Sequence, residues 1–240
     1  MNDHADTMER IVPDLMDRND AAARISLKLH EERYAFACRY LIPGRVLDIA
    51  CGTGYGTNML SQYSDQECTG VDISADAISY ALKRYAHPRT RFIREDLMKF
   101  KDEKQFENIV SLETIEHLPE PEKVVAHLNE LLRPGGQLIV SAPVTPSTDG
   151  NPYHVNDFTA RSFRALFLQQ GFKELACLEQ KQPFTFKEVA NRKKQLPGET
   201  RRGILQYYLN NPSKFFGRIR SLIIDGFNNR YLVLVLRKGS

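Results

Sequence analysis

The segment Arg45–Gly56, RVLDIACGTGYG, constrains the fold of this chain more than any other. An apolar strand-like run that contains one acid, Asp48, leads into a glycine-rich loop, and a helical pattern follows. A strand, a glycine-rich turn and a helix N-terminus form a nucleotide-binding crevice, because glycine lets the backbone approach a ligand and the helix end offers free N–H groups. The G-x-G-x-G spacing differs from the G-x-G-x-x-G loop that cradles a pyrophosphate. A carboxylate beside the loop would repel a pyrophosphate, so the pattern favours a cationic ligand such as an amino acid that bears a sulfonium.

Length and composition are those of a single globular domain. With 240 residues, of which 42% are hydrophobic and 26% charged, the chain can bury one sizeable core. No apolar run approaches the ~20 residues of a membrane span, and the polar start MNDHADTMER does not resemble a signal peptide. The four cysteines show no C-x-x-C spacing, so neither a zinc knuckle nor a disulfide framework is expected. We therefore expect a reduced, cytoplasmic protein.

Charge is distributed unevenly along the chain. Residues 181–240 carry 13 Lys and Arg against 3 Asp and Glu, a net charge of +10, whereas residues 1–180 carry 20 against 27, a net charge of −7. A basic end of this kind could meet an anionic substrate, a carrier protein, a lipid surface or nucleic acid. It could equally be a solvated helical face. Nucleic acid is the partner that we expect least, because no aromatic and basic interleaving of an RNA-binding module is present.

Strand-like and helical patterns alternate along the middle of the chain. Strands are predicted at 46–50, 68–73, 91–94, 108–112 and 137–142, and helices at 21–41, 55–63, 75–86, 120–132 and 159–170. Alternation at this spacing indicates βαβ units and a parallel sheet. Two further strands are expected near 172–180 and at 231–236. The basic stretch between them contains helical pieces at 203–209 and 214–224.

The segment that begins at Arg45 resembles motif I of the class I S-adenosylmethionine-dependent methyltransferases, and the resemblance extends over roughly residues 30–180. It implies a Rossmann-like α/β fold with a seven-stranded, mostly parallel sheet that ends in a C-terminal antiparallel hairpin. One domain is then expected, with an N-terminal helical lid at 1–42, a core at 43–182, a basic insertion at 183–228 and the last strand at 229–240. S-adenosyl-L-methionine is the implied cofactor and S-adenosyl-L-homocysteine the product.

The cofactor site should be assembled from the carboxyl ends of the strands, where open parallel sheets bind ligands. Asp72 follows the second strand and is placed to accept hydrogen bonds from the ribose hydroxyls. After the third strand, Asp96 can accept from the adenine amino group while Leu97 covers the ring. Tyr34 shares a helix face with His30 and Arg33, where it could cap the sulfonium or be a core residue. The residues expected at the cofactor are Tyr34, Asp48, Ala50, Gly52, Gly54, Asp72, Ile73, Asp96, Leu97, Leu112 and Glu113.

The reaction centre is expected at the E-x-x-E-H sequence Glu113–His117 and at His154. If residues 113–117 form a helical turn, then Glu113, Glu116 and His117 converge on one side. One hypothesis makes His117 or His154 a general base assisted by Glu113. A second makes Glu113, Glu116, His117 and His154 the ligands of a divalent metal such as Mg²⁺, a pattern similar to that of the small-RNA 2′-O-methyltransferases. A third is structural, with His117 held by Glu113 and with Glu116 on the surface.

The resemblance is nearest to small-molecule enzymes such as the ubiquinone-pathway O-methyltransferases, which carry E-x-x-E-H at this position. We expect methyl transfer to an oxygen, less so a nitrogen, of a small molecule from secondary-metabolite, sugar or quinone-type biosynthesis. The alternatives are a metal-dependent RNA 2′-O-methyltransferase, a nicotinamide-dependent oxidoreductase and a non-catalytic cofactor-binding subunit; a homodimer is compatible with each. Aromatic residues of the insertion could line the acceptor pocket or form the insertion's own core, namely Phe184, Phe186, Tyr207, Tyr208, Phe215 and Phe216.

Overall fold

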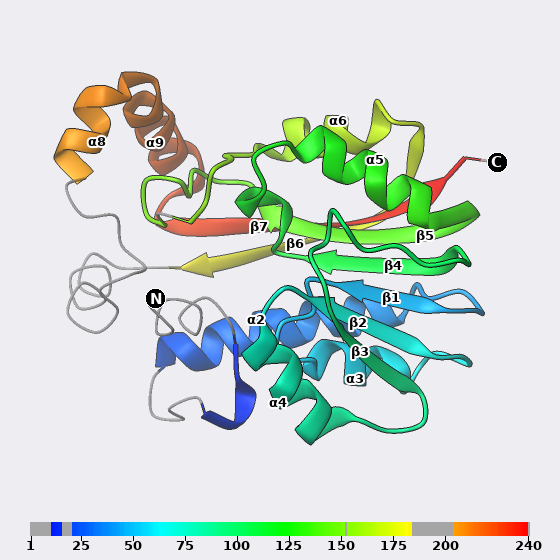
Figure 1. Ribbon diagram of the computed structural model, residues 1–240. Coiled ribbons are helices and arrows are strands. Elements are labelled where there is room, and N and C mark those ends of the chain that lie inside the picture. The colour runs from blue at the N-terminus through cyan, green and yellow to red at the C-terminus, as the bar shows by residue number, and fades with distance from the viewer. Residues whose placement is uncertain (1–10, 16–20, 152, 184–203, 240) are drawn as a thin grey trace.

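The alternating strands and helices form one sheet that is flanked by helices, as the computed structural model of the chain shows (Figure 1). The structure describes residues 11–15, 21–151, 153–183 and 204–239. The helices are η1 (Pro13–Leu15), α2 (Ala21–Cys38), α3 (Tyr55–Ser61), α4 (Ala75–Tyr85), η2 (Ile115–His117), α5 (Pro121–Leu131), α6 (Ala160–Leu168), α8 (Ile204–Asn210) and α9 (Pro212–Asp225). The strands are β1 (Val46–Ile49), β2 (Cys68–Asp72), β3 (Thr90–Arg94), β4 (Phe106–Leu112), β5 (Leu132–Pro143), β6 (Phe172–Pro183) and β7 (Asn228–Lys238).

The strand order confirms the predicted fold class. The sheet runs β3-β2-β1-β4-β5-β7-β6. Neighbours from β3 to β5 are parallel, and β7 pairs antiparallel with both β5 and β6. The boundary that differs most from its prediction is the start of β5: it begins at Leu132, because Leu132 already pairs with Phe106 ahead of the Pro134–Gly136 turn. The turn is therefore an irregularity within the strand pairing.

The alternation of side chains along β1 divides the apolar core between the two faces of the sheet. Leu47 and Ile49 belong to the cluster that packs under α5 and α6. Val46 belongs to the opposite cluster, which includes residues of α2 and α3. Asp48 has the same parity as Val46, so its carboxylate enters the α2–α3 side of the sheet. This places a buried acid next to the glycine-rich loop.

Helices α8 and α9 lie at the end of the sheet where the parallel strands finish, on the left of Figure 1, whereas α2 packs along one face of the sheet. Helix α2 confirms the predicted helix at 21–41, although it ends at Cys38. Helices α8 and α9 correspond to the helical pieces predicted within the insertion. Most of the first 20 residues and the segment 184–203, with Phe184 and Phe186, lie outside the described residues. Within the described ranges, no helix combines the length and the apolar character that a membrane span requires.

Candidate active site

The carboxyl ends of β1 and β4 form the centre of the candidate site. These strands are neighbours, and the chain order reverses between them, so they mark the switch point at which open α/β sheets bind ligands. Among the described residues, only Ala50 and Glu113 combine a side chain with a left-handed backbone, with φ of 62° and 51°. Each directly follows one of these two strands. Strained backbone of this kind concentrates at functional sites.

Each of the three positions in the loop is occupied by glycine for a different structural reason. Gly52 has a φ of 54° and open space where a Cβ would stand, which fits a close approach by a ligand. At Gly54 a Cβ would lie 2.7 Å from the side chains of Ala81 and Phe92. At Gly56 it would lie 1.9 Å from Cζ of Tyr34. Two of the glycines are therefore required by packing inside the protein, and Gly52 is the position best suited to contact the cofactor.

Asp48 is buried beneath the loop rather than exposed at its edge. Its carboxylate accepts a 2.7 Å hydrogen bond from Thr57 Oγ1 and longer bonds, 3.3 and 3.4 Å, from the hydroxyl of Tyr34. Burial raises the pKa of Asp48 to about 7, against the opposing effect of these donors. A cation at the crevice would favour the ionised form of Asp48. The residue can thus contribute negative potential toward the sulfonium or the ammonium group of S-adenosylmethionine.

Tyr34 is a core residue in this structure. Its ring is buried against Gly56 and meets Tyr55 edge-on, with 5.6 Å between the ring centroids. Burial and the nearby carboxylate of Asp48 hold the pKa of the phenol well above its usual value, so the hydroxyl stays a donor. Of the two roles proposed for Tyr34, the structure favours packing and the support of Asp48.

Asp72 connects β2 to the glycine-rich loop. Its two carboxylate oxygens accept hydrogen bonds from the backbone N–H groups of Gly52 (2.8 Å) and Ser74 (2.9 Å). These bonds orient the carboxylate at the carboxyl end of β2. A carboxylate offers about four acceptor positions, so capacity remains for the ribose hydroxyls. The predicted ribose contact is compatible with this geometry.

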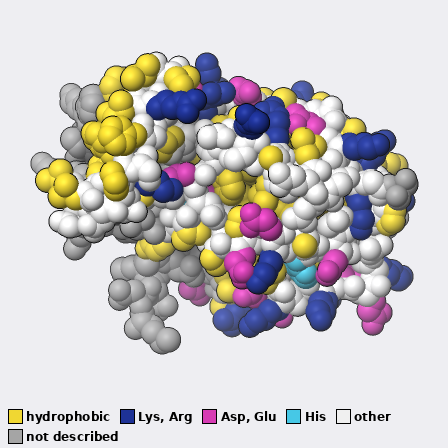
Figure 2. Space-filling view, turned by 90° about the horizontal axis from the view of Figure 1, so that it is seen from above, with side chains coloured by type: hydrophobic (Ala, Val, Ile, Leu, Met, Phe, Trp, Pro, Cys, Tyr) yellow, Lys and Arg dark blue, Asp and Glu magenta, His cyan; other side chains and the backbone are white. Residues whose placement is uncertain are grey.

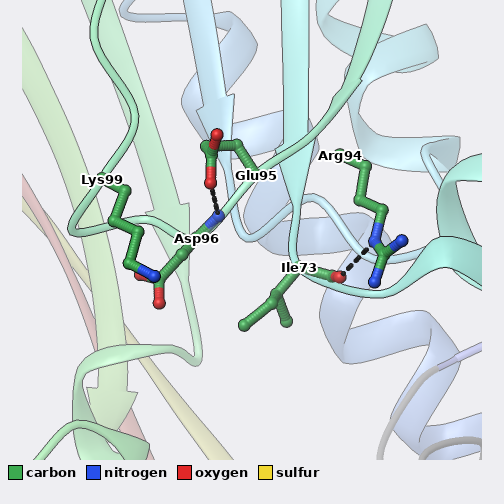
Figure 3. Close-up of a pocket in the computed structure, with 5 residues that line it drawn as sticks. All are labelled: Ile73, Arg94, Glu95, Asp96 and Lys99. Atoms are coloured by element: carbon green, nitrogen blue, oxygen red, sulfur yellow. Dashed lines mark hydrogen bonds between the residues drawn. The ribbon is translucent and has the colours of Figure 1, made fainter.

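A pocket of about 350 Å³ lies beside the third strand, where the adenine was predicted (Figure 3). It is lined by Ile73, Arg94, Glu95, Asp96 and Lys99. The Ile73 side chain is 59% exposed and lies between Asp96 and Arg94. Asp96 is fixed because one of its oxygens accepts the Met98 N–H at 2.8 Å. An exposed apolar side chain beside a fixed carboxylate suits a flat base that carries an amino group.

Two residues that were predicted to contact the cofactor have side chains that pack in the hydrophobic core. Leu97 packs in the cluster beneath α5 and α6, and Leu112 packs in the cluster beside α2. Their backbone groups still lie at the strand ends. The cover over an adenine therefore falls to Ile73, and the backbone of Leu97 is what remains for recognition.

Glu113 is held by residues far away in the sequence. Its carboxylate accepts a 2.6 Å hydrogen bond from Ser141 Oγ and lies 3.5 Å from Nη1 of Arg33. Arg33 is 1% exposed, donates to Gln180 at 2.7 Å, and places its guanidinium 4.4 Å from the ring centroid of Tyr231. The lid helix α2 is thus fastened to the end of β4. Arg33, Ser141 and Gln180 were not predicted as site residues, because only tertiary contacts unite them.

The predicted helical turn over residues 113–117 is wrong in its first residue. Glu113 has a positive φ, and the 3₁₀ helix η2 begins only at Ile115. Glu113 therefore points toward Arg33 and does not converge with Glu116 and His117. The structural hypothesis is also wrong in placing Glu116 on the surface, because this residue is 1% exposed.

Glu116, His117 and His154 do come together. One ligand atom from each of the three lies within 4.8 Å of the others, and the two imidazole rings meet edge-on at 4.7 Å between centroids. Backbone bonds hold the two segments: the carbonyl of Glu116 accepts from the N–H groups of Val155 (2.9 Å) and Asn156 (3.1 Å). These bonds fasten the loop after β5 to η2 and hold His154 beside His117.

The two histidines differ in their capacity to take a proton. Burial and, to a smaller extent, the neighbouring His117 lower the pKa of His154 to about 4, so His154 is neutral at pH 7. Nδ1 of His117 lies 3.2 Å from the carbonyl of Tyr153. A carbonyl only accepts, so a neutral His117 carries its proton on Nδ1, and its Nε2 is unprotonated. That nitrogen faces Glu116 at 4.0 Å.

The three grouped side chains could also hold a metal ion. Two imidazoles and a carboxylate suit Zn²⁺, Fe²⁺ or Mn²⁺, whereas Mg²⁺ demands oxygen ligands. Nδ1 of His154 is buried and has no hydrogen-bond partner within the described part of the chain, which fits a ligand atom. Glu113 is not part of this group, since Ser141 and Arg33 engage its carboxylate. The donor set thus fits a transition metal better than the predicted Mg²⁺.

Comparison with known proteins agrees with this geometry. Residues 46–136 match the family model described as a methyltransferase domain, which covers the strands from β1 to the start of β5. The matched segment is a methyltransferase domain, and the strand order is the one predicted for the class I S-adenosylmethionine-dependent methyltransferases. S-adenosylmethionine is accordingly the cofactor that the relatives support.

Among curated proteins, the chain is 28% identical over 177 residues to a Mycobacterium tuberculosis protein named "Probable S-adenosylmethionine-dependent methyltransferase Rv3030". The match covers 71% of this chain, and the chain spans about 62% of Rv3030. Among solved structures, the YcgJ protein of Bacillus subtilis aligns with a TM-score of 0.66 at 17% identity, covering 88% of this chain and 100% of YcgJ. The N-methyltransferase NodS of Bradyrhizobium japonicum, in complex with S-adenosylhomocysteine, aligns with a TM-score of 0.62 at 14% identity, covering 93% and 90%.

Proposed function

We propose that the protein transfers the methyl group of S-adenosylmethionine to an oxygen of a small molecule, with His117 as the general base. Methyl transfer from a sulfonium is an in-line displacement, so the protein needs mainly to align the acceptor and to remove its proton. The observation that carries the proposal is the pairing of η2 with the loop after β5. It joins His117 and His154 beside the carboxyl ends of the strands that form the cofactor crevice.

The division of roles between the histidines follows from their environments. A general base works best when its pKa lies near the operating pH, and His154, with a pKa of about 4, is a poor proton acceptor. In neutral His117 the Nε2 atom is unprotonated and can accept a proton, because the Nδ1–H is oriented toward the Tyr153 carbonyl. The neutral His154 would accept or donate a hydrogen bond to orient the acceptor. Glu116, next to Nε2 of His117, would stabilise the imidazolium after proton transfer.

The base role is tested by single-turnover kinetics of His117→Gln, once an acceptor has been found by screening phenols, sugars and amines with radiolabelled S-adenosylmethionine. The expected result is a fall in kcat of about 10²- to 10⁴-fold with unchanged cofactor affinity. His127→Gln, which changes a histidine of α5, is the matched control. A fall in kcat of less than about threefold would contradict the role of His117 as base.

The same assay separates the base from the metal hypothesis. Activity that survives excess chelator supports a base acting without metal. Loss of activity in chelator that Zn²⁺ or Mn²⁺ restores would instead assign Glu116, His117 and His154 as ligands.

A nitrogen acceptor is the second candidate, because NodS, a structural neighbour of this chain, is an N-methyltransferase. A protonated amine must lose a proton before its nitrogen can attack, and a neutral amine must lose one after attack, so the proposed base serves either acceptor. The acceptor screen distinguishes the two outcomes. Methylation of amines alone would replace the oxygen proposal while leaving the role of His117 intact.

A further inference from the structure

Helix α9 lies on the protein with its polar face inward. Lys214, Arg218, Ser221 and Asp225 follow one another at spacings of four, three and four residues, which puts them on a single helix face. That face meets the loop after β5: Nζ of Lys214 lies 2.6 Å from Asp157. Charged contacts therefore attach this face of the helix to the protein.

The remaining contacts of this polar face of α9 also involve charged side chains. Arg218 donates through Nε to Asp149 at 2.7 Å and through Nη2 to the Pro146 carbonyl at 2.6 Å. Asp225 accepts from Arg230 at 2.7 Å. These charged partners are half-buried or buried, so the rotation of α9 about its axis is fixed.

Helix α8 also turns polar groups toward the protein and apolar side chains toward the outside. Tyr207 and Tyr208 turn toward the core, where their hydroxyls meet Thr148 Oγ1 at 3.0 Å and the carboxylate of Asp149. Leu205, four residues before Leu209, is 73% exposed. The tyrosines of the insertion thus bind the loop after β5.

The outward surface of the two helices is consequently apolar. We call the α8–α9 apolar face the set Leu205, Leu209, Phe216, Ile219, Ile223 and Ile224, all of them exposed. Phe216 is 68% exposed and Ile223 is 79% exposed. Figure 2 shows hydrophobic side chains gathered at this end of the molecule with Lys and Arg beside them. A soluble helix normally turns its apolar stripe to the core, and a contiguous exposed patch marks an interaction site.

Charge identifies the kind of partner. The single acid of residues 204–225 is Asp225, which is paired with Arg230, whereas Arg220 is exposed on the outer side of α9. Residues 181–240 as a whole carry a net charge of +10. A surface that combines exposed Phe, Leu and Ile with positive charge is complementary to the boundary between the acyl chains and the headgroups of an anionic bilayer.

We propose that the α8–α9 apolar face docks the protein on an anionic lipid surface. The apolar side chains enter the acyl boundary, and Arg220 faces the headgroups. The loop after β5, which carries His154, is fastened directly beneath these helices, so docking brings the acceptor side of the site close to the membrane. This inference is independent of the proposed methyl transfer, because binding requires no turnover.

Vesicle co-sedimentation of the full chain tests the proposal. Wild type should pellet with phosphatidylglycerol–phosphatidylcholine vesicles, less so as salt is raised, and should stay in solution with phosphatidylcholine alone. Phe216→Glu combined with Ile223→Glu should weaken binding at least about tenfold. Arg220→Ala should weaken it about fivefold, the effect of one basic residue near an anionic surface. Leu168→Glu on α6, another exposed leucine, is the matched control and should bind as wild type does.

Circular dichroism checks that each variant is folded, and the changed residues are exposed, so folding should be preserved. Three results would overturn the proposal. The first is failure of wild type to pellet with anionic vesicles. The second is binding of the Phe216→Glu, Ile223→Glu variant that is as tight as that of wild type. The third is a concentration-dependent dimer, seen by sedimentation velocity and abolished by the same double variant, which would assign the face to a second copy of this chain.

Discussion

Replacing Asp48 by Asn should stabilise the protein at alkaline pH when no cofactor is bound. The carboxylate is buried, and its pKa rises from 3.8 to about 7 on folding. The folded state holds the proton more tightly than the unfolded chain does. The free energy of unfolding of wild type should therefore fall as the pH rises from about 4 to about 7 and then stay level.

The size of the effect follows from the shift. A change of one pKa unit corresponds to about 1.4 kcal/mol, so the ionised Asp48 costs about 4 kcal/mol at pH 8. At pH 5 Asp48 is protonated in the folded protein and mostly ionised in the unfolded chain. This difference lowers the free energy of unfolding by about 2 kcal/mol relative to acidic pH. Asn is neutral at both pH values and nearly isosteric. The stability gained by Asp48→Asn should therefore grow by about 2 kcal/mol from pH 5 to pH 8, on top of any constant loss of hydrogen bonding to Thr57.

Urea unfolding followed by circular dichroism at the two pH values measures this difference. Asp76→Asn, which removes an exposed carboxylate from the first turn of α4, is the matched control and should show no such growth with pH. A difference between Asp48→Asn and wild type that stays constant from pH 5 to pH 8 would refute the raised pKa of Asp48.

Three further predictions concern packing and binding. Gly56→Ala should lower the free energy of unfolding by about 3 kcal/mol in urea titrations, because the new methyl group would lie 1.9 Å from Tyr34; a loss below about 1 kcal/mol would contradict this. Arg33→Met should cost about 3 kcal/mol in the same assay, because it leaves Glu113 without its buried partner, whereas unchanged stability would contradict the ion pair. Asp72→Ala should weaken S-adenosylhomocysteine binding about 10- to 100-fold by calorimetry, and an unaltered Kd would remove Asp72 from the ribose site.

The parallel sheet and its acids were predictable because they depend on local pattern. Strand periodicity located β1, β2 and β3, and in a parallel sheet their carboxyl ends meet at one edge. Asp72 and Asp96 could therefore be predicted to lie at the same edge of the sheet before any contact was known.

What the sequence could not reveal depends on contacts between distant segments. Arg33 reaches Gln180 across 147 residues, and no local pattern records such a pairing. The positive φ of Glu113 follows from its bonds to Ser141 in the neighbouring strand, so a helical turn was the natural but incorrect prediction. The orientation of α9 also depends on contacts with a distant segment. Its periodicity reveals two faces, but the ion pairs with Asp149 and Asp157 decide which face turns inward.

Calorimetric titration of the full chain with S-adenosylhomocysteine, and separately with NAD, tests most directly whether the crevice at the ends of β1, β2 and β3 holds S-adenosylmethionine. We expect one-to-one binding of S-adenosylhomocysteine and no binding of NAD. Tight binding of NAD with none of S-adenosylhomocysteine would contradict it.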